Sequence, residues 1–173
     1  MKNRPSAEWL ALPESQIALI AEHQGIAPVP VGAIAKSLGL AVKVATLPVD
    51  ISGEIKPDTH ASAGFQIRVN KHEAKTRQRF TIAHEIAHFL LHKHLIKDGL
   101  TDSILYRSKL TNKREAEANR LAADILMPWS LVDSWRTGLK GVDIRSLAPQ
   151  LASYLEVSEV ALKIRLGING VEE

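Results

Sequence analysis

The stretch RFTIAHEIAHFLLHKH, residues 79–94, holds four histidines and one glutamate in a run that is otherwise mostly apolar. Its apolar residues recur at helical spacing, which predicts a helix. His84 and His88 are four residues apart, so both rings project from one face about a turn apart. Two imidazoles placed in this way can reach one ion at the ~2.0 to 2.1 Å that zinc prefers. We therefore expect this helix to carry a metal site.

Glu85 completes an H-E-x-x-H pattern with these two histidines. Because it follows His84 by one residue, it points to the side of the ion, where it can hold a water instead of binding the metal. It would take a proton from the attacking water and return it to the leaving amine, while zinc polarises the scissile carbonyl. A chance match is disfavoured, since burying two unpaired imidazoles in an apolar run would be costly. We expect His84 and His88 as zinc ligands and Glu85 as the catalytic base.

Catalytic zinc usually has three protein ligands, so a third must be found. His92 follows His84 by eight residues, about 12 Å along a helix that rises ~1.5 Å per residue. It is too far away to share the ion, and we expect a packing or surface role. His94 has the spacing of metzincin proteases, but Leu91 stands where those enzymes have the glycine that turns the chain back to the metal.

The favoured third ligand is a carboxylate within REAEANRLAADILMP, residues 114–128, which reads as a strong helix stopped by its final proline. Glu115 and Asn119 are four residues apart and share one face. Glu115 could bind the metal while Asn119 orients a ligand histidine. Glu117 lies roughly 200° around the helix from Glu115 and should point away from the site. Glu117 and His94 stay open as alternatives.

The rest of the chain is predicted to form helices around a small sheet. The expected segments are a helical pair over 13–40, about three antiparallel strands over 41–70, the two metal-site helices over 71–127 and shorter helices over 128–168. Asn70 and Glu73 form a capping-box pattern at the start of the histidine helix. The 173 residues suffice for one domain with a real core and are too few for two of ordinary size. We expect a single α+β domain.

Composition and charge exclude several classes of protein. Apolar residues make up 45% and charged residues 24%, as in a globular protein rather than a disordered or membrane one. The net charge of +3 is scattered along the chain and is a weak argument for nucleic acid. There is no cysteine to form a disulfide, a thiolate metal site or a nucleophile. No signal-peptide run or membrane-length apolar run is seen, so we expect a cytoplasmic location.

Five segments together resemble the ImmA/IrrE metallopeptidases. In order, they are PVPVGAIAKSLGL, DISGEI, IRVN, RQRFTIAHEIAHFLLH and EANRLAADILMP. These proteins resemble gluzincin zinc enzymes, which implies a zincin-like fold with His84, His88 and Glu115 as Zn²⁺ ligands and Glu85 as base. The resemblance also implies an intracellular regulator acting on a protein. That partner would be a helix-turn-helix repressor or antitoxin, which the chain cleaves or controls.

Several questions stay open at this stage. An oxyanion donor is required, and Tyr106, His60 and His94 are candidates, although surface roles are commoner for such residues. The strand GFQIRVN could offer an edge to a substrate, but an interior position is favoured.

Two rival functions also remain. The chain could be a zinc-containing toxin or repressor-binding protein without protease activity. It could also be a DNA-binding regulator, because the N-terminal helical pair has the outline of a helix-turn-helix. The would-be recognition helix has Lys36 as its one basic residue, so a scaffold role is favoured.

Overall fold

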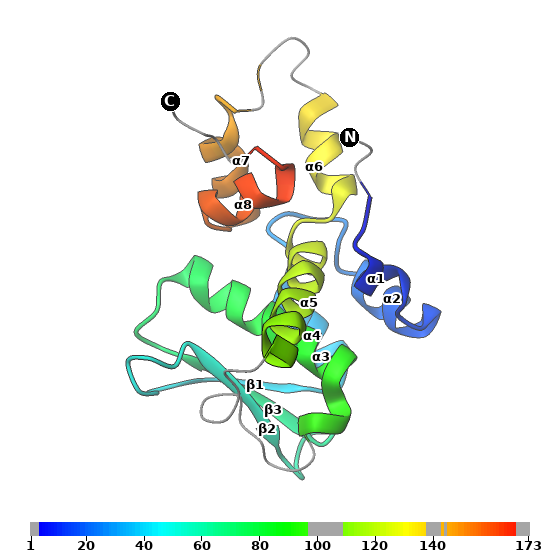
Figure 1. Cartoon of the computed structure of the whole chain (residues 1–173), viewed down its shortest axis with the longest axis vertical. Coiled ribbons are helices and arrows are strands. Elements are labelled where there is room, and N and C mark those ends of the chain that lie inside the picture. The colour runs from blue at the N-terminus through cyan, green and yellow to red at the C-terminus, as the bar shows by residue number, and fades with distance from the viewer. Residues whose placement is uncertain (1–3, 97–108, 138–142, 144, 169–173) are drawn as a thin grey trace.

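The structure is a computed structural model and describes residues 4–96, 109–137, 143 and 145–168. Within these ranges the elements are α1 (Ala7–Leu10), α2 (Glu14–Ala21), α3 (Val31–Ser37), β1 (Ala41–Ala45), β2 (Gly53–Pro57), β3 (Phe65–Asn70), α4 (Lys75–Ile96), α5 (Lys109–Leu126), α6 (Trp129–Thr137), α7 (Ala148–Leu155) and α8 (Glu159–Leu166). Figure 1 shows the sheet at one end of the molecule, α6 to α8 at the other, and α4 and α5 between them. The predicted α+β fold is confirmed.

The sheet has three strands, as predicted, but it is mixed rather than antiparallel. β3 is the middle strand, with β1 on one side and β2 on the other. β2 pairs antiparallel with β3, whereas β1 pairs parallel with it. The expectation of a wholly antiparallel sheet is therefore wrong at β1. The chain goes from β1 to the far edge at β2 and then returns between them, so β3 runs in the direction of β1.

β3 is also the interior strand that the sequence favoured over an edge strand. Ile67 is fully buried and pairs with Val42 of β1 and Ile55 of β2. The free edges of this sheet are β1 and β2, so β3 has no edge to offer to an extended substrate.

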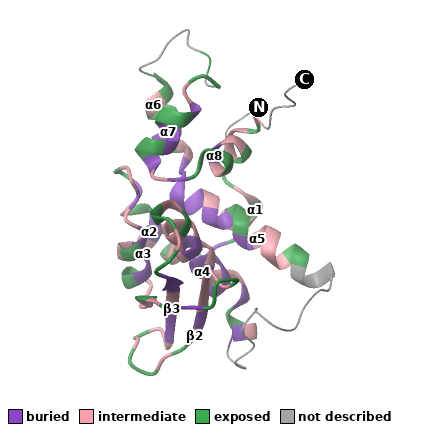
Figure 2. Cartoon of the chain, turned by 90° about the vertical axis from the view of Figure 1, so that its left-hand side faces the viewer, coloured by how far each residue is buried: buried purple, intermediate pink, exposed green. Residues whose placement is uncertain are grey.

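α4 lies between the sheet and α5, with which it packs extensively. Its middle is buried on several faces, because Ala83, Ile86 and Ala87 have no exposed surface and Phe89 is nearly covered. A helix that is apolar around most of its circumference is typical of an interior position. Figure 2 shows the buried residues gathered along β3, α4 and α5. The helix that carries the H-E-x-x-H residues is thus part of the core.

The loop into α4 differs from the prediction. α4 begins at Lys75, and Asn70 is the last residue of β3 instead of a helix cap. The Asn70 side chain donates hydrogen bonds to the carbonyl oxygens of Leu47, Pro48 and Ile51. Glu73 accepts a hydrogen bond from Ser52 Oγ at 2.8 Å. The expected capping box is wrong because both of its polar side chains are used to hold the β1–β2 loop.

Gly53 fixes how closely β2 approaches α4. A Cβ atom at this position would collide with the Thr81 side chain of α4 and with the Arg68 carbonyl oxygen of β3. Only glycine, which has no side chain, allows the strand to lie this close. β2 is thereby held against the turn of α4 that precedes His84.

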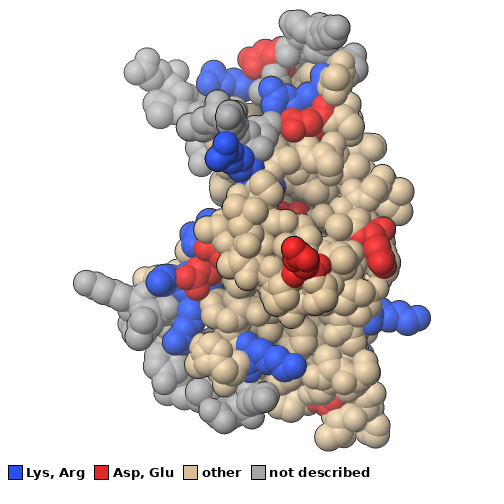
Figure 3. Space-filling view, turned by 90° about the vertical axis from the view of Figure 1, so that its right-hand side faces the viewer, with Lys and Arg blue, Asp and Glu red and all other residues tan. Residues whose placement is uncertain are grey.

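The helical pair at the N-terminus packs as scaffold. Val31, Ile34 and Ala35 of α3 are buried, and α3 contacts α4 and β1. The described part of α3 thus contributes side chains to the core. Figure 3 shows Lys and Arg scattered over one face among acidic and uncharged residues.

None of the described helices is long and apolar enough to span a membrane.

Candidate metal centre

Three side chains of the kinds that can bind a metal converge where α4 meets α5. His84 Nε2 lies 3.0 Å from His88 Nε2, and each lies 3.2 Å from an oxygen of Glu115. Among the described residues this is the one group of His, Asp or Glu able to share an ion. This cluster has two causes. The two histidines are one helical turn apart on α4, and α5 packs across α4 so that Glu115 reaches them. The sequence had favoured this trio as ligands.

The donor set fits a small transition-metal ion. Ligand atoms at ~2.0 to 2.1 Å from a tetrahedral ion lie about 3.3 Å from one another. The observed separations of 3.0 and 3.2 Å are close to this value. Two imidazoles and one carboxylate also form a known catalytic donor set for zinc. With three donors, one coordination position stays open, whereas structural zinc sites usually have four protein ligands.

Glu115 is held in its ionised form. Hydrogen bonds with His84 and His88 keep the pKa of this carboxyl well below its ordinary value, and they outweigh the opposing effect of partial burial. An ionised carboxylate is the form that binds a metal. Glu115 is therefore ready to act as a ligand over the whole neutral pH range.

Asn119 contacts the outer nitrogen of His84. Its Oδ1 lies 3.0 Å from His84 Nδ1. An amide oxygen only accepts hydrogen bonds, so Nδ1 carries the proton and Nε2 of a neutral ring has a free lone pair. That lone pair points to Glu115 and His88. Asn119 itself is exposed, and it lies one helical turn after Glu115, as its i, i+4 spacing led us to expect.

The Nδ1 atom of His88 contacts a second histidine, and the sequence analysis did not predict this contact. His88 Nδ1 lies 3.0 Å from His92 Nδ1, and His92 Nε2 lies 3.1 Å from Glu117 Oε2. His92 does not join the cluster, as expected, but it has a buried polar contact instead of a packing or surface role. Burial is the main cause that lowers its pKa, opposed by the hydrogen bond to Glu117.

The prediction that Glu117 points away needs correction. Glu117 stays outside the ligand cluster, but it faces His92 of α4 instead of solvent. The prediction treated the histidine helix as regular, whereas the backbone of His92 leaves helical dihedrals, with φ −126° and ψ 21°. The i, i+4 repeat of His84, His88 and His92 indicates the contact between His88 and His92. The distance from His84 excludes His92 as a ligand but does not exclude this contact.

Glu85 lies next to the cluster on α4 and is buried, with 8% of its surface exposed. It is three residues before His88, so the two share adjacent positions on the helix surface. It is not one of the three converging donors. This placement agrees with a residue that acts beside the metal and not on it.

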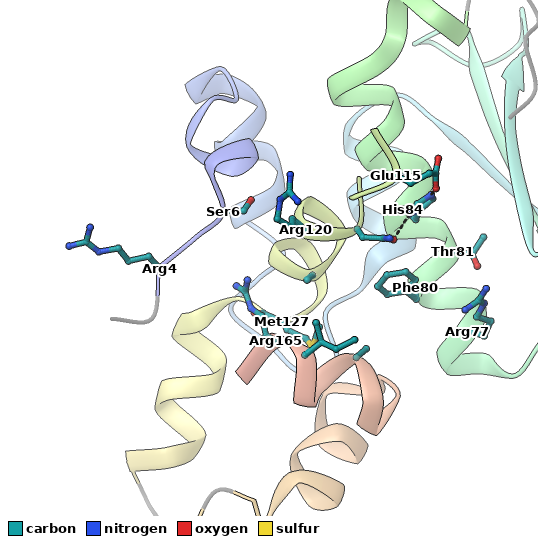
Figure 4. Close-up of a pocket in the computed structure, with 14 residues that line it drawn as sticks. Arg4, Ser6, Arg77, Phe80, Thr81, His84, Glu115, Arg120, Met127 and Arg165 are labelled. Carbon is teal, nitrogen blue, oxygen red and sulfur yellow. Dashed lines mark hydrogen bonds and ion pairs between the residues drawn. The ribbon is translucent and has the colours of Figure 1, made fainter. Parts of the chain in front are cut away.

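A cavity of about 680 Å³ opens beside the cluster. In Figure 4, His84 and Glu115 meet at one end of this cavity, Met127 and Arg165 lie at the other, and Phe80 lies in between. Its walls come from α4, α5, α8 and the segment before α1. The remaining residues that line it are Arg4, Ser6, Arg77, Thr81, Asn119, Arg120, Ala123, Ala161 and Ile164. The open side of the metal cluster is therefore reached through a mainly apolar groove with arginines among its lining.

The segment before α1 and the first turn of α1 are held beside the groove by contacts with α5 and α6. Ser6 N donates to Asp124 at 2.9 Å, Arg120 pairs with Glu8 at 2.6 Å, and Trp129 Nε1 donates to the Arg4 carbonyl oxygen at 2.7 Å. No pattern in the sequence predicts that Arg4 and Ser6 border the site.

The candidate oxyanion donors are not brought into the cluster. His60 is exposed in the β2–β3 connection, where its backbone N–H donates to Asp58, and His94 is exposed near the end of α4. Neither belongs to the converging group. Tyr106 lies outside the described residues.

Comparison with protein families gives one finding. The profile of the Peptidase M78 family, described as the IrrE N-terminal-like domain, matches residues 38–167. No curated protein matches the chain. The matched range includes the sheet, the complete three-donor cluster and Glu85.

Proposed function

The chain belongs to the IrrE N-terminal-like family of M78 peptidases, and we propose on this premise that it is a zinc-dependent endopeptidase. The observation that carries the proposal is the convergence of His84, His88 and Glu115 with one side open to a groove. The two imidazoles and the carboxylate would hold the Zn²⁺ ion. When bound, such an ion supplies Lewis acidity, which acidifies water and polarises a carbonyl group.

Glu85 would move the proton. A carboxylate beside the open position takes the proton of the attacking water and later gives it to the nitrogen of the leaving amine. Its burial excludes bulk water, which strengthens the electrostatic attraction for that proton. His84 and His88 serve the same step indirectly, because their fixed rings determine where the water stands relative to Glu85.

The groove would bind an extended segment of a protein. Phe80, Ala123, Met127 and Ile164 offer apolar surface for side chains of the substrate. Arg77 lies two helical turns before His84 on the same face of α4, so it could meet a carbonyl or an acidic side chain a few residues from the cleaved bond. These features support a peptide substrate.

For the biological substrate we retain a helix-turn-helix repressor or antitoxin, and a regulatory role for the chain inside the cell. The support for this partner is the family resemblance, which points to regulators acting on such proteins. A protein that binds the repressor without cutting it would use the same groove, so the test must separate cleavage from binding.

The test compares the wild-type protein, Glu85→Gln and the exposed-carboxylate control Glu22→Gln, each loaded with Zn²⁺. A peptide library from digested cell proteins serves as substrate, together with the product of the neighbouring reading frame when it encodes a helix-turn-helix protein. Mass spectrometry detects new termini. We expect Glu85→Gln to lower cleavage by ~10²- to 10⁴-fold, the usual contribution of a general base. Its zinc content should equal that of wild type and Glu22→Gln.

Unchanged cleavage by zinc-loaded Glu85→Gln would contradict the peptidase mechanism. Tight binding of the helix-turn-helix protein without cleavage by the zinc-loaded wild type would favour the sequestering alternative instead.

A further inference from the structure

A line of three side chains leads away from the three-donor cluster, from α4 across to α5. It runs from His88 Nδ1 to His92 Nδ1 over 3.0 Å, and from His92 Nε2 to Glu117 Oε2 over 3.1 Å. His88 and His92 are buried, and the Glu117 side chain is 24% exposed. We infer that His92 and Glu117 are positioning residues, which hold the His88 ring in the orientation and tautomer that can bind a metal.

The hydrogen-bond inventory of these groups allows one consistent proton arrangement for neutral rings. A carboxylate only accepts hydrogen bonds, so His92 Nε2 must carry a proton and donate it to Glu117. Nδ1 of the neutral His92 ring is then an acceptor, and His88 Nδ1–H donates to it. His88 Nε2 then carries no proton, and it is this atom that lies 3.2 Å from Glu115. The line thus selects the tautomer of His88 that can bind a metal.

The orientation of the His88 ring is fixed from the same side. Its plane makes an angle of 48° with the plane of His92, with 5.2 Å between the ring centroids. His92 can take this position because the backbone of α4 departs from helical dihedrals at that residue. Glu117 belongs to α5, the helix that also supplies Glu115. One helix therefore provides both a carboxylate for the cluster and a carboxylate that acts through a histidine behind it.

Lys113 lies near the outer end of this line, with its Nζ 3.8 Å from Glu117 Oε1 and its side chain 74% exposed. An ion pair this long and this exposed contributes little. The link between Glu117 and His92 is therefore the contact on which the inference depends.

This inference rests on the metal site of the proposed function, and its effect should appear in metal binding itself. Partners of this kind fix the tautomer and ring orientation of a ligand histidine, and removing them typically costs 10- to 100-fold in metal affinity. We expect a loss of that size for the apparent Zn²⁺ affinity of His92→Leu and of Glu117→Leu.

The test measures Zn²⁺ affinity by competition with a chromophoric chelator, and coordination geometry by the visible absorption of the Co²⁺-substituted protein. His92→Leu removes the acceptor, whereas His92→Asn places an amide oxygen near the position of Nδ1. His94→Leu is the matched control, an exposed histidine on the same helix. Circular dichroism of each metal-free variant reports whether the fold is kept.

We expect His92→Leu and Glu117→Leu to bind Zn²⁺ 10- to 100-fold more weakly with an altered Co²⁺ spectrum. His92→Asn should recover most of the affinity, and His94→Leu should match wild type. Should His92→Leu not fold, the partly exposed Glu117→Leu decides the question.

Wild-type affinity and an unchanged Co²⁺ spectrum in a folded His92→Leu or Glu117→Leu protein would overturn the inference and leave the proposed function intact. Equal losses in His92→Leu and His92→Asn would also overturn it, because they would indicate packing instead of a hydrogen bond. A wild-type protein that binds no Zn²⁺ would overturn the proposed function as well.

Discussion

His84 and His88 lie one helical turn apart and direct Nε2 at the same carboxylate, yet the two flanks of the site are built differently. On the open flank, His84 contacts the neutral amide of exposed Asn119 and borders the groove. On the closed flank, His88 is buried and contacts His92, which is held by a carboxylate. The open flank can admit a substrate. The closed flank can hold geometry, because both of its histidines are buried.

Both flanks share Glu115, and removing its carboxylate should lower Zn²⁺ affinity more than any other change. Glu115 contacts both histidines, so Glu115→Gln removes the one charged donor of the cluster. Removing a residue that only hydrogen-bonds a metal ligand costs up to ~100-fold in metal affinity. We expect the loss of Zn²⁺ affinity in Glu115→Gln to be larger than that. Chelator competition measures it. A Glu117→Gln protein is the matched control, because its amide oxygen can still accept from His92. A larger loss in Glu117→Gln than in Glu115→Gln would exchange the roles of the two residues.

On the open flank we expect a smaller loss. Asn119→Ala should lower Zn²⁺ affinity by about tenfold, at the low end of the range for outer partners. Asn119 is exposed, so a water molecule can take the place of its amide oxygen against His84 Nδ1. The same titration as for His92→Leu measures it. A loss in Asn119→Ala that exceeds that of His92→Leu would remove the distinction between the flanks.

The smallest effect is expected at the outer wall of the groove. Glu8 and Arg120 form an ion pair with an N–O distance of 2.6 Å on the open flank. Because Arg120 is largely exposed, a double-mutant cycle in denaturant should give a coupling free energy below about 1 kcal/mol. Zn²⁺ affinity should not change. A coupling of several kcal/mol would show that the N-terminal segment is a structural part of the site.

The same pair predicts a pH dependence. The hydrogen bond from Arg120 lowers the pKa of Glu8 below its ordinary value. The stability contributed by the pair is therefore present above the unfolded pKa of about 4.3 and is lost as the pH falls through the folded pKa. The difference in free energy of unfolding between wild type and Arg120→Gln should shrink as the solution is acidified.

The open flank was easier to anticipate from the sequence than the closed one. His84, His88, Glu115 and Asn119 follow from i, i+4 spacing on two regular helices, and the structure brings these side chains together. His88 and His92 have the same i, i+4 spacing, but the departure of His92 from helical dihedrals and its contact with Glu117 of α5 depend on packing between the two helices, which periodicity does not show.

Other features of the fold also depend on contacts between distant segments, which local sequence patterns do not predict. Strand alternation identified three strands but carries no information on their order, so the parallel pairing of β1 with β3 was missed. An asparagine such as Asn70 suits a helix cap or a loop equally well, and contacts with Leu47 and Ile51 place its side chain against the loop. Contacts between the N-terminal segment and α5 join residues more than 100 positions apart.

The most direct test of the account is a crystal structure of the Zn²⁺-loaded protein. We predict one ion bound by His84 Nε2, His88 Nε2 and a Glu115 oxygen, with its remaining position open to the groove. Asn119 should still contact His84, and His92 should still contact His88. An ion bound by His92, His94 or Glu117 would contradict the account, and so would a cluster closed by a fourth protein ligand.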